Sequence, residues 1–175
     1  MTRTARTALL VTLGITAAAA SSEAGGLDLF GGYSYTRRTD ESLHGVNLTG
    51  TWGLSRRLGL AADVGHHRGD IFGLSVKLTS LMAGPRINVL GGHRRVFVRA
   101  MGGGVRTSES PAFFDGAAHS ETTLGFLAGG GLDWDLGERW GVRLSGDYYR
   151  IQADVEPVSQ PRASLGVSYR FGGGR

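Results

Sequence analysis

Three consecutive residues, His119, Ser120 and Glu121, are of the types that could perform nucleophilic chemistry. A serine hydroxyl activated by a histidine base, with an acid orienting that base, is the set that acyl hydrolysis uses. On a β-strand, however, neighbouring side chains point to opposite faces, so His119 and Ser120 would diverge. We therefore predict no catalytic residues in this chain.

A second cluster, His66, His67 and Asp70, combines imidazole and carboxylate groups that bind transition metals. The two histidines are also neighbours and would diverge on a strand, and no third firm ligand follows them. The chain has no cysteine, so disulfides and thiolate metal sites are excluded. We predict neither a metal site nor a cofactor.

The first 24 residues have the pattern of a secretory signal peptide. Arg3 and Arg6 form a basic start, and an apolar stretch runs from Ala8 to Ala20. That stretch is too short for the ~20 residues of a membrane-spanning helix. Cleavage after Ala20 and cleavage after Ala24 both remain open, and residues 25–175 form one predicted domain.

Beyond residue 24 the dominant pattern is an alternation of apolar and polar residues with period two. It predicts eight strands, at about 26–36, 44–54, 58–67, 74–89, 96–106, 122–135, 141–151 and 162–171. Their length suits tilted strands that cross a bilayer, and an even number suits a closed barrel. The predicted fold is all-β: an eight-stranded antiparallel up-and-down transmembrane β-barrel.

The polar face of these strands is composed mainly of glycine, serine, threonine and aspartate with a few arginines. Such small residues suit a narrow lumen, whereas a soluble barrel would carry many lysines and glutamates outside. The predicted connections alternate in length: Ser55–Arg57, Leu90–Arg95 and Leu136–Trp140 are short, and Arg37–Leu43, His67–Gly73, Thr107–Glu121 and Gln152–Pro161 are longer. Short periplasmic turns and longer outer loops are typical of outer-membrane barrels.

The last predicted strand ends in the alternating apolar series Ala163, Leu165, Val167, Tyr169 and Phe171. This series resembles the β-signal of outer-membrane proteins, which the barrel-assembly machinery reads. Typical members end at the phenylalanine, whereas this chain continues with Gly172–Arg175. The stretches 81–86 (LMAGPR) and 129–133 (GGGLD) also resemble the small outer-membrane barrel family of the OmpA membrane domain and OmpX. The resemblance implies a porin-like envelope protein of Gram-negative bacteria.

Eight charged residues fall on the predicted inward face and form a predicted lumen charge network: Asp28, Asp63, Arg86, Arg99, Asp133, Arg143, Asp147 and Arg170. Counting across the short turns places Arg86 opposite Arg99 and Asp133 opposite Arg143. An eight-stranded barrel leaves room for little more than its own side chains. We therefore expect a plugged polar lumen rather than an open pore.

The basic excess of the chain, +4, comes almost entirely from scattered arginines, and nucleic-acid binding needs a clustered basic face instead. Five of the arginines fall near the outer loop ends and are candidate contacts for lipopolysaccharide phosphates: Arg37, Arg38, Arg68, Arg106 and Arg150. The expected partners are outer-membrane lipid, lipopolysaccharide and the assembly machinery, with no nucleic acid, and the barrel is expected to be a monomer.

The function predicted on these grounds is a non-enzymatic outer-membrane barrel with a structural or surface-interaction role. Two alternatives stay open at this point. One is a lipid-modifying outer-membrane enzyme of the lipid A hydrolase kind, because those small barrels use a histidine, a serine and an acid near the outer interface. The other is a soluble, exported, ligand-binding barrel, which would have the same period-two pattern.

Overall fold

A computed structural model describes residues 26–38, 41–71, 74–90, 94–111, 119–152 and 158–172. The predicted signal peptide and its cleavage positions lie outside these residues. Within them the chain forms eight strands: β1 (Leu27–Arg38), β2 (Glu41–Gly53), β3 (Leu58–Ile71), β4 (Leu74–Asn88), β5 (Arg94–Pro111), β6 (His119–Asp135), β7 (Trp140–Ile151) and β8 (Val158–Phe171). No helix of the described residues is long and apolar enough to cross a membrane.

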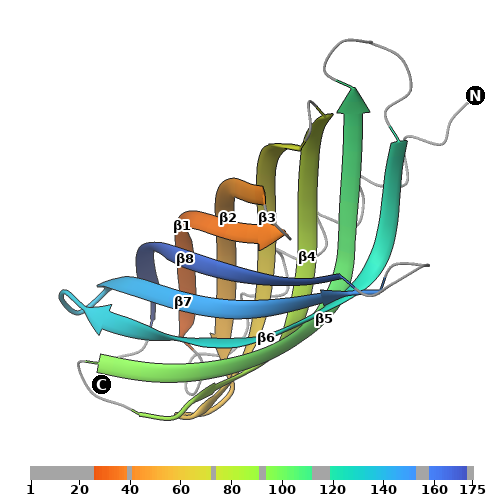
Figure 1. The fold of residues 1–175 in the computed structure, drawn as a ribbon. Coiled ribbons are helices and arrows are strands. Elements are labelled where there is room, and N and C mark those ends of the chain that lie inside the picture. Colours follow the sequence, from red (N-terminus) through yellow and green to blue (C-terminus); the bar gives the residue numbers. More distant parts are fainter. Residues whose placement is uncertain are drawn as a thin grey trace, which may run out of the picture.

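The strands pair antiparallel in chain order, and β1 pairs with β8, so the sheet is a closed barrel (Figure 1). Pairing followed from Tyr33 through β2, β3, β4 and β5 reaches Thr122 on β6. Pairing followed the other way, through β8 and β7, reaches Leu132, ten residues further along β6. This stagger tilts every strand and sets the barrel diameter. The predicted eight-stranded antiparallel barrel is confirmed.

The outer surface is apolar over the middle of the barrel, because alternate residues of every strand project outward. Large apolar side chains there are about half exposed, among them Val46, Leu48, Leu60, Val64, Leu81, Leu124, Phe126, Leu144 and Leu165. Outward aromatic residues lie at both ends of this band: Trp52, Trp134, Trp140, Tyr169 and Phe171 near the short turns, and Tyr33, Tyr35 and Tyr148 near the other end. An apolar band between two aromatic girdles is the outer face of a membrane barrel.

The outer loops are shorter in the structure than the sequence predicted. Strand pairing continues to Arg38 with Glu41 and to Ile71 with Leu74. Glu109 also pairs with His119, and Ile151 pairs with Val158, so parts of all four predicted loops are strand. The β5–β6 hairpin is the longest and rises above its neighbours (Figure 1). Every backbone group that finds a partner across the ladder avoids the cost of an unpaired one, which favours extending the strands.

Candidate functional site

The lumen near the short turns holds a group of buried ion pairs centred on Asp133. Asp133 is fully buried and accepts hydrogen bonds from Nη2 of Arg86 at 2.5 Å and from Nε of Arg143 at 2.5 Å. Nη2 of Arg143 also donates to Asp28 at 2.6 Å. Asp28 and Arg143 lie 115 residues apart in the chain, and closure of the barrel brings them together, because β1 and β7 both pair with β8. One carboxylate therefore holds two arginines from β4 and β7.

A second group lies further along the lumen and contains Asp63, Arg99, Asp147 and Arg162. Arg99 donates two hydrogen bonds to the carboxylate of Asp147, at 2.9 and 2.7 Å. Arg162 bridges both acids: its Nη1 lies 2.8 Å from Asp63, and its Nη2 lies 2.9 Å from Asp147. Bidentate arginine–carboxylate pairs of this kind are strong and directional.

Arg162 was missing from the predicted network, although it is 2% exposed and makes three hydrogen bonds to carboxylates. It begins the predicted last strand at position 162, and it has the same parity as Ser164, Ser168 and Arg170. The alternation of β8 therefore contained the signal. It was overlooked because Arg162 adjoins a stretch predicted to be loop.

Glycines on the inner face make room for these large side chains. Gly129 lies between Arg99 and Asp147 in the register, and a Cβ atom on Gly129 would collide with the Asp147 carboxylate. Arg99 and Asp147 come from β5 and β7 and meet across the empty position on β6. In the same way a Cβ atom on Gly131 would lie 2.7 Å from the Phe97 ring.

The register sets Arg86 opposite Arg99, a like-charge neighbour pair that would be destabilising by itself. The two side chains bind different acids, Arg86 to Asp133 and Arg99 to Asp147. Asp63 contacts Arg99 at 3.8 Å, and its hydrogen-bonding arginine is Arg162. The Phe97 ring also contacts Arg86, whose Cζ lies 3.8 Å from the ring centroid. Cation–π contact stabilises a guanidinium in a dry site.

At the lumen mouth near the short turns, Arg170 and Arg95 are partly exposed, with 27% and 19% of their side-chain surfaces accessible. Both contact Asp135, and Arg170 donates to it in a short hydrogen bond. Asp28 is 3.8 Å from Nε of Arg170, its neighbour across the β1–β8 seam. Arg170 thus belongs to the edge of the network and not to its dry centre.

The lumen is not uniformly polar, contrary to the predicted polar interior. A cluster of buried side chains faces inward from β3 to β7: Ala61, Leu78, Met82, Met101, Val105, Leu127, Tyr149 and Ile151. Leu43 and Val76, near the outer ends of β2 and β4, are also buried. The prediction was made from the small and charged residues of the inward face, and it omitted these apolar ones. Apolar side chains fill the volume that the tilt of the barrel creates beyond the ion pairs.

The candidate chemical clusters lie apart in the fold. His66 projects outward and donates to or accepts from Thr79 at 3.0 Å, whereas His67 is buried in the lumen beside Ser34, with Nε2 2.6 Å from the hydroxyl. Ser34 and His67 are almost completely buried, so a substrate has no access to this pair. The side chains of Asp70, His119 and Ser120 lie outside the described part of the structure. No cluster of three potential metal ligands occurs among the described residues.

Four of the five candidate lipopolysaccharide contacts, Arg37, Arg68, Arg106 and Arg150, are exposed near the outer end of the barrel. The backbone of Arg38 pairs with Glu41, and its side chain is not among those described. The register places Arg68 directly opposite Lys77, the only lysine, which the sequence reasoning did not select. Position 77 shares the outward parity of Thr79 and Leu81, so alternation could have identified it.

The predicted β-signal series projects outward along β8, where it pairs with β1 on one side and β7 on the other. Phe171 pairs with Leu27, and Tyr169 pairs with Leu29 and with Trp140. The Trp140 and Tyr169 rings pack edge to face with centroids 4.7 Å apart. These residues form the seam that closes the barrel.

A closed antiparallel barrel with an apolar outside and a charged, densely filled inside defines an integral outer-membrane β-barrel protein. The chain belongs to the outer membrane protein beta-barrel domain family, whose model matches residues 7–171. Its place is therefore the bacterial outer membrane, as predicted. Comparison with curated proteins finds no match.

Several solved structures share the fold. Neisserial surface protein A is similar with 15% identity over 87% of this chain and 100% of its own, at a TM-score of 0.69. Ail of Yersinia pestis, solved with the heparin analogue sucrose octasulfate, has 19% identity over 85% of this chain and 100% of its own, at a TM-score of 0.61. The N-terminal barrel of Pseudomonas aeruginosa OprF has 20% identity over 85% of this chain and 98% of its own, at a TM-score of 0.56.

Proposed function

We propose that this protein is a non-enzymatic, monomeric structural barrel of the outer membrane that presents its outer end to surface partners and passes no solute. The observation that supports this most is the filled lumen. Four of its charged side chains are each at most 2% exposed: Asp63, Asp133, Arg143 and Arg162. Arg143 binds Asp133 and Asp28, and Arg162 binds Asp63. A solute would have to break several buried ion pairs to pass, each at high cost.

Planar-bilayer recording tests the closed lumen. The barrel should give no steady single-channel conductance, because charged and apolar side chains fill the cross-section from Asp28 to Leu43. Asp147→Ala combined with Arg162→Ala removes a carboxylate and a guanidinium at one level. This variant should conduct more than the unchanged protein. Large steady conductance of the unchanged protein would contradict the proposal.

We further propose that the outer end binds lipopolysaccharide phosphates. Arg68 and Lys77 project outward side by side, a like-charge pair that is destabilising unless an anion lies between them. Arg68 is oriented by its Nε, which donates to His66 at 3.0 Å, and His44 faces it from β2. No described acidic side chain shares this outward surface. The crystallisation of Ail with a polyanion accords with anion binding by a barrel of this fold.

Binding to lipopolysaccharide vesicles should fall when Arg68→Gln and Lys77→Gln are combined. Each basic residue near an anionic surface contributes about 1 kcal/mol, so the affinity should drop roughly 25-fold. The control is Arg56→Gln with Arg57→Gln, which removes the same charge at the opposite end. Vesicles of dephosphorylated lipopolysaccharide should bind the unchanged protein and both variants equally. Equal binding of both variants to phosphorylated vesicles would refute the proposed contact.

A further inference from the structure

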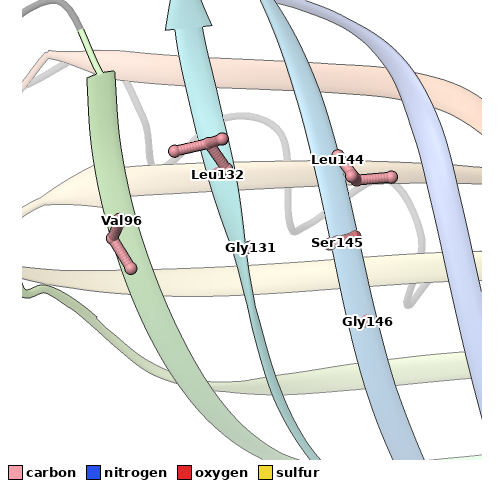
Figure 2. A pocket seen from close by; sticks show the side chains of 6 residues that line it. All are labelled: Val96, Gly131, Leu132, Leu144, Ser145 and Gly146. Carbon is pink, nitrogen blue, oxygen red and sulfur yellow. The ribbon is translucent and has the colours of Figure 1, made fainter.

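A shallow apolar groove crosses the outer surface of β5, β6 and β7. It is lined by Val96, Gly131, Leu132, Leu144, Ser145 and Gly146, and Figure 2 shows the three apolar side chains on three neighbouring strands. A Cβ atom on Gly146 would have nothing within 4 Å. Gly146 projects outward on β7, so the missing side chain leaves the groove open.

Two exposed arginines lie at the short-turn end of these strands, and one of them, Arg94, borders the groove. Arg94 shares the outward face of β5 with Val96, two residues away, and its Cζ lies 5.5 Å from the centroid of the Trp134 ring. Trp134 in turn shares the outward face of β6 with Leu132. The cation–π contact holds the guanidinium of Arg94 at the level of the aromatic girdle.

The second arginine, Arg139, belongs to the turn between β6 and β7. Its backbone oxygen accepts a hydrogen bond from the amide of Arg170 at 2.9 Å, and its Nη1 donates to the Tyr169 hydroxyl at 3.4 Å. Trp140, 55% exposed, packs against the same tyrosine. Tryptophan and tyrosine rings prefer the level of lipid headgroups, so Arg139 lies at headgroup depth.

The short-turn end of the barrel, here called the rim, has an excess of positive charge beside the groove. In the described β6–β7 turn, Glu138 is the single acidic side chain, while Asp133 and Asp135 face the lumen and bind arginines there. Arg94 is therefore available to a phosphate, and the apolar groove begins beside it. Arg139 is held at Tyr169 on β8, on the far side of β7 from the groove. A soluble phosphate would use Arg94 but not the groove, and a neutral lipid would use the groove but not Arg94.

We propose that this surface binds one anionic phospholipid of the periplasmic leaflet, with its headgroup phosphate at Arg94 and an acyl chain in the groove beside Gly146. The site lies on the opposite end of the barrel from the proposed lipopolysaccharide contacts. It is independent of them, because it shares no residue with them. The lipid would fix the depth of the barrel on its periplasmic side.

Native mass spectrometry tests this site. The barrel is extracted from vesicles that contain equal amounts of phosphatidylglycerol and phosphatidylethanolamine with the same acyl chains, and the lipids that it retains are measured. The unchanged protein should retain one phosphatidylglycerol. Arg94→Gln should lower its retention about fivefold, the effect of about 1 kcal/mol for one arginine. Gly146→Leu, which fills the groove and leaves the charge unchanged, should lower retention of both lipids.

Arg139→Gln is the matched control, because it removes one positive charge from the same end of the barrel at Tyr169, away from the groove. This variant should retain phosphatidylglycerol as the unchanged protein does. Fluorescence provides a second readout, because all three tryptophans lie near this rim. Brominated phosphatidylglycerol should quench them more than brominated phosphatidylcholine, and this preference should fall in the Arg94→Gln variant. Equal retention of the two lipids by the unchanged protein would overturn the proposal. Unaltered retention by the Arg94→Gln variant would overturn it as well.

Discussion

Asp133→Ala is expected to lower the free energy of unfolding by about 3–5 kcal/mol, because it leaves the buried guanidinium of Arg86 without a carboxylate partner. Asp133 is fully buried and accepts hydrogen bonds from both Arg86 and Arg143. Asp28 still contacts Arg143, whereas Arg86 has no other carboxylate within ion-pair distance among the described residues. Urea unfolding of the folded barrel in vesicles, followed by tryptophan fluorescence, measures the loss.

A double-mutant cycle separates the ion pair from the side-chain truncation. Asp133→Ala should cost less in an Arg143→Ala background than in the unchanged protein, because the interaction between Asp133 and Arg143 is then already absent. Asp135→Ala is the matched control: its partners Arg170 and Arg95 reach water, so its loss should be smaller. Additive losses for Asp133 and Arg143 would contradict the coupling inferred from their contact.

Deleting residues 169–175 is expected to abolish insertion into the outer membrane, whereas deleting 172–175 is expected to leave it intact. The longer deletion removes the pairs of Tyr169 with Leu29 and of Phe171 with Leu27, which close the barrel between β8 and β1. Unpaired backbone groups cannot be tolerated in the hydrocarbon layer. The shorter deletion removes no strand pair. Envelope fractionation and the mobility of heated and unheated samples in gels measure insertion.

Recognition by the assembly machinery, which we propose for this strand, requires a test that keeps the backbone. Tyr169→Ala with Phe171→Ala preserves the ladder and removes the aromatic signal. This variant should refold into vesicles in vitro and insert poorly in cells. Normal insertion in cells would show that the aromatic residues close the barrel without acting as a signal.

The alternation of the sequence was sufficient to predict the strands, their faces and their neighbours. A strand has a side-chain period of two, so parity alone assigns Phe126 to lipid and Asp133 to the lumen. A short turn fixes the register of its hairpin, and counting across it gives Arg86 opposite Arg99 and Asp133 opposite Arg143, the pairs that the register contains. Both inferences use only residues that are close in the chain.

Contacts between strands that are not hairpin neighbours could not be obtained in this way. Arg143 reaches Asp28 and Arg162 reaches Asp63 over sequence separations of 115 and 99 residues. Which residues meet depends on the ten-residue stagger of the closed barrel, on its diameter and on the empty position that Gly129 leaves between β5 and β7. Local periodicity contains no information about these three quantities.

The sequence by itself thus determined an eight-stranded membrane barrel with an apolar outside, because each strand must satisfy the bilayer separately. Only the tertiary structure decided how the inside is filled: Arg162 joins the ion pairs, and Leu78, Met82 and Leu127 pack beyond them. It also decided that the groove at Gly146 meets Arg94 at the rim, since three strands must lie side by side to form it. Closure of the sheet brings these residues together, and closure is a property of all eight strands at once.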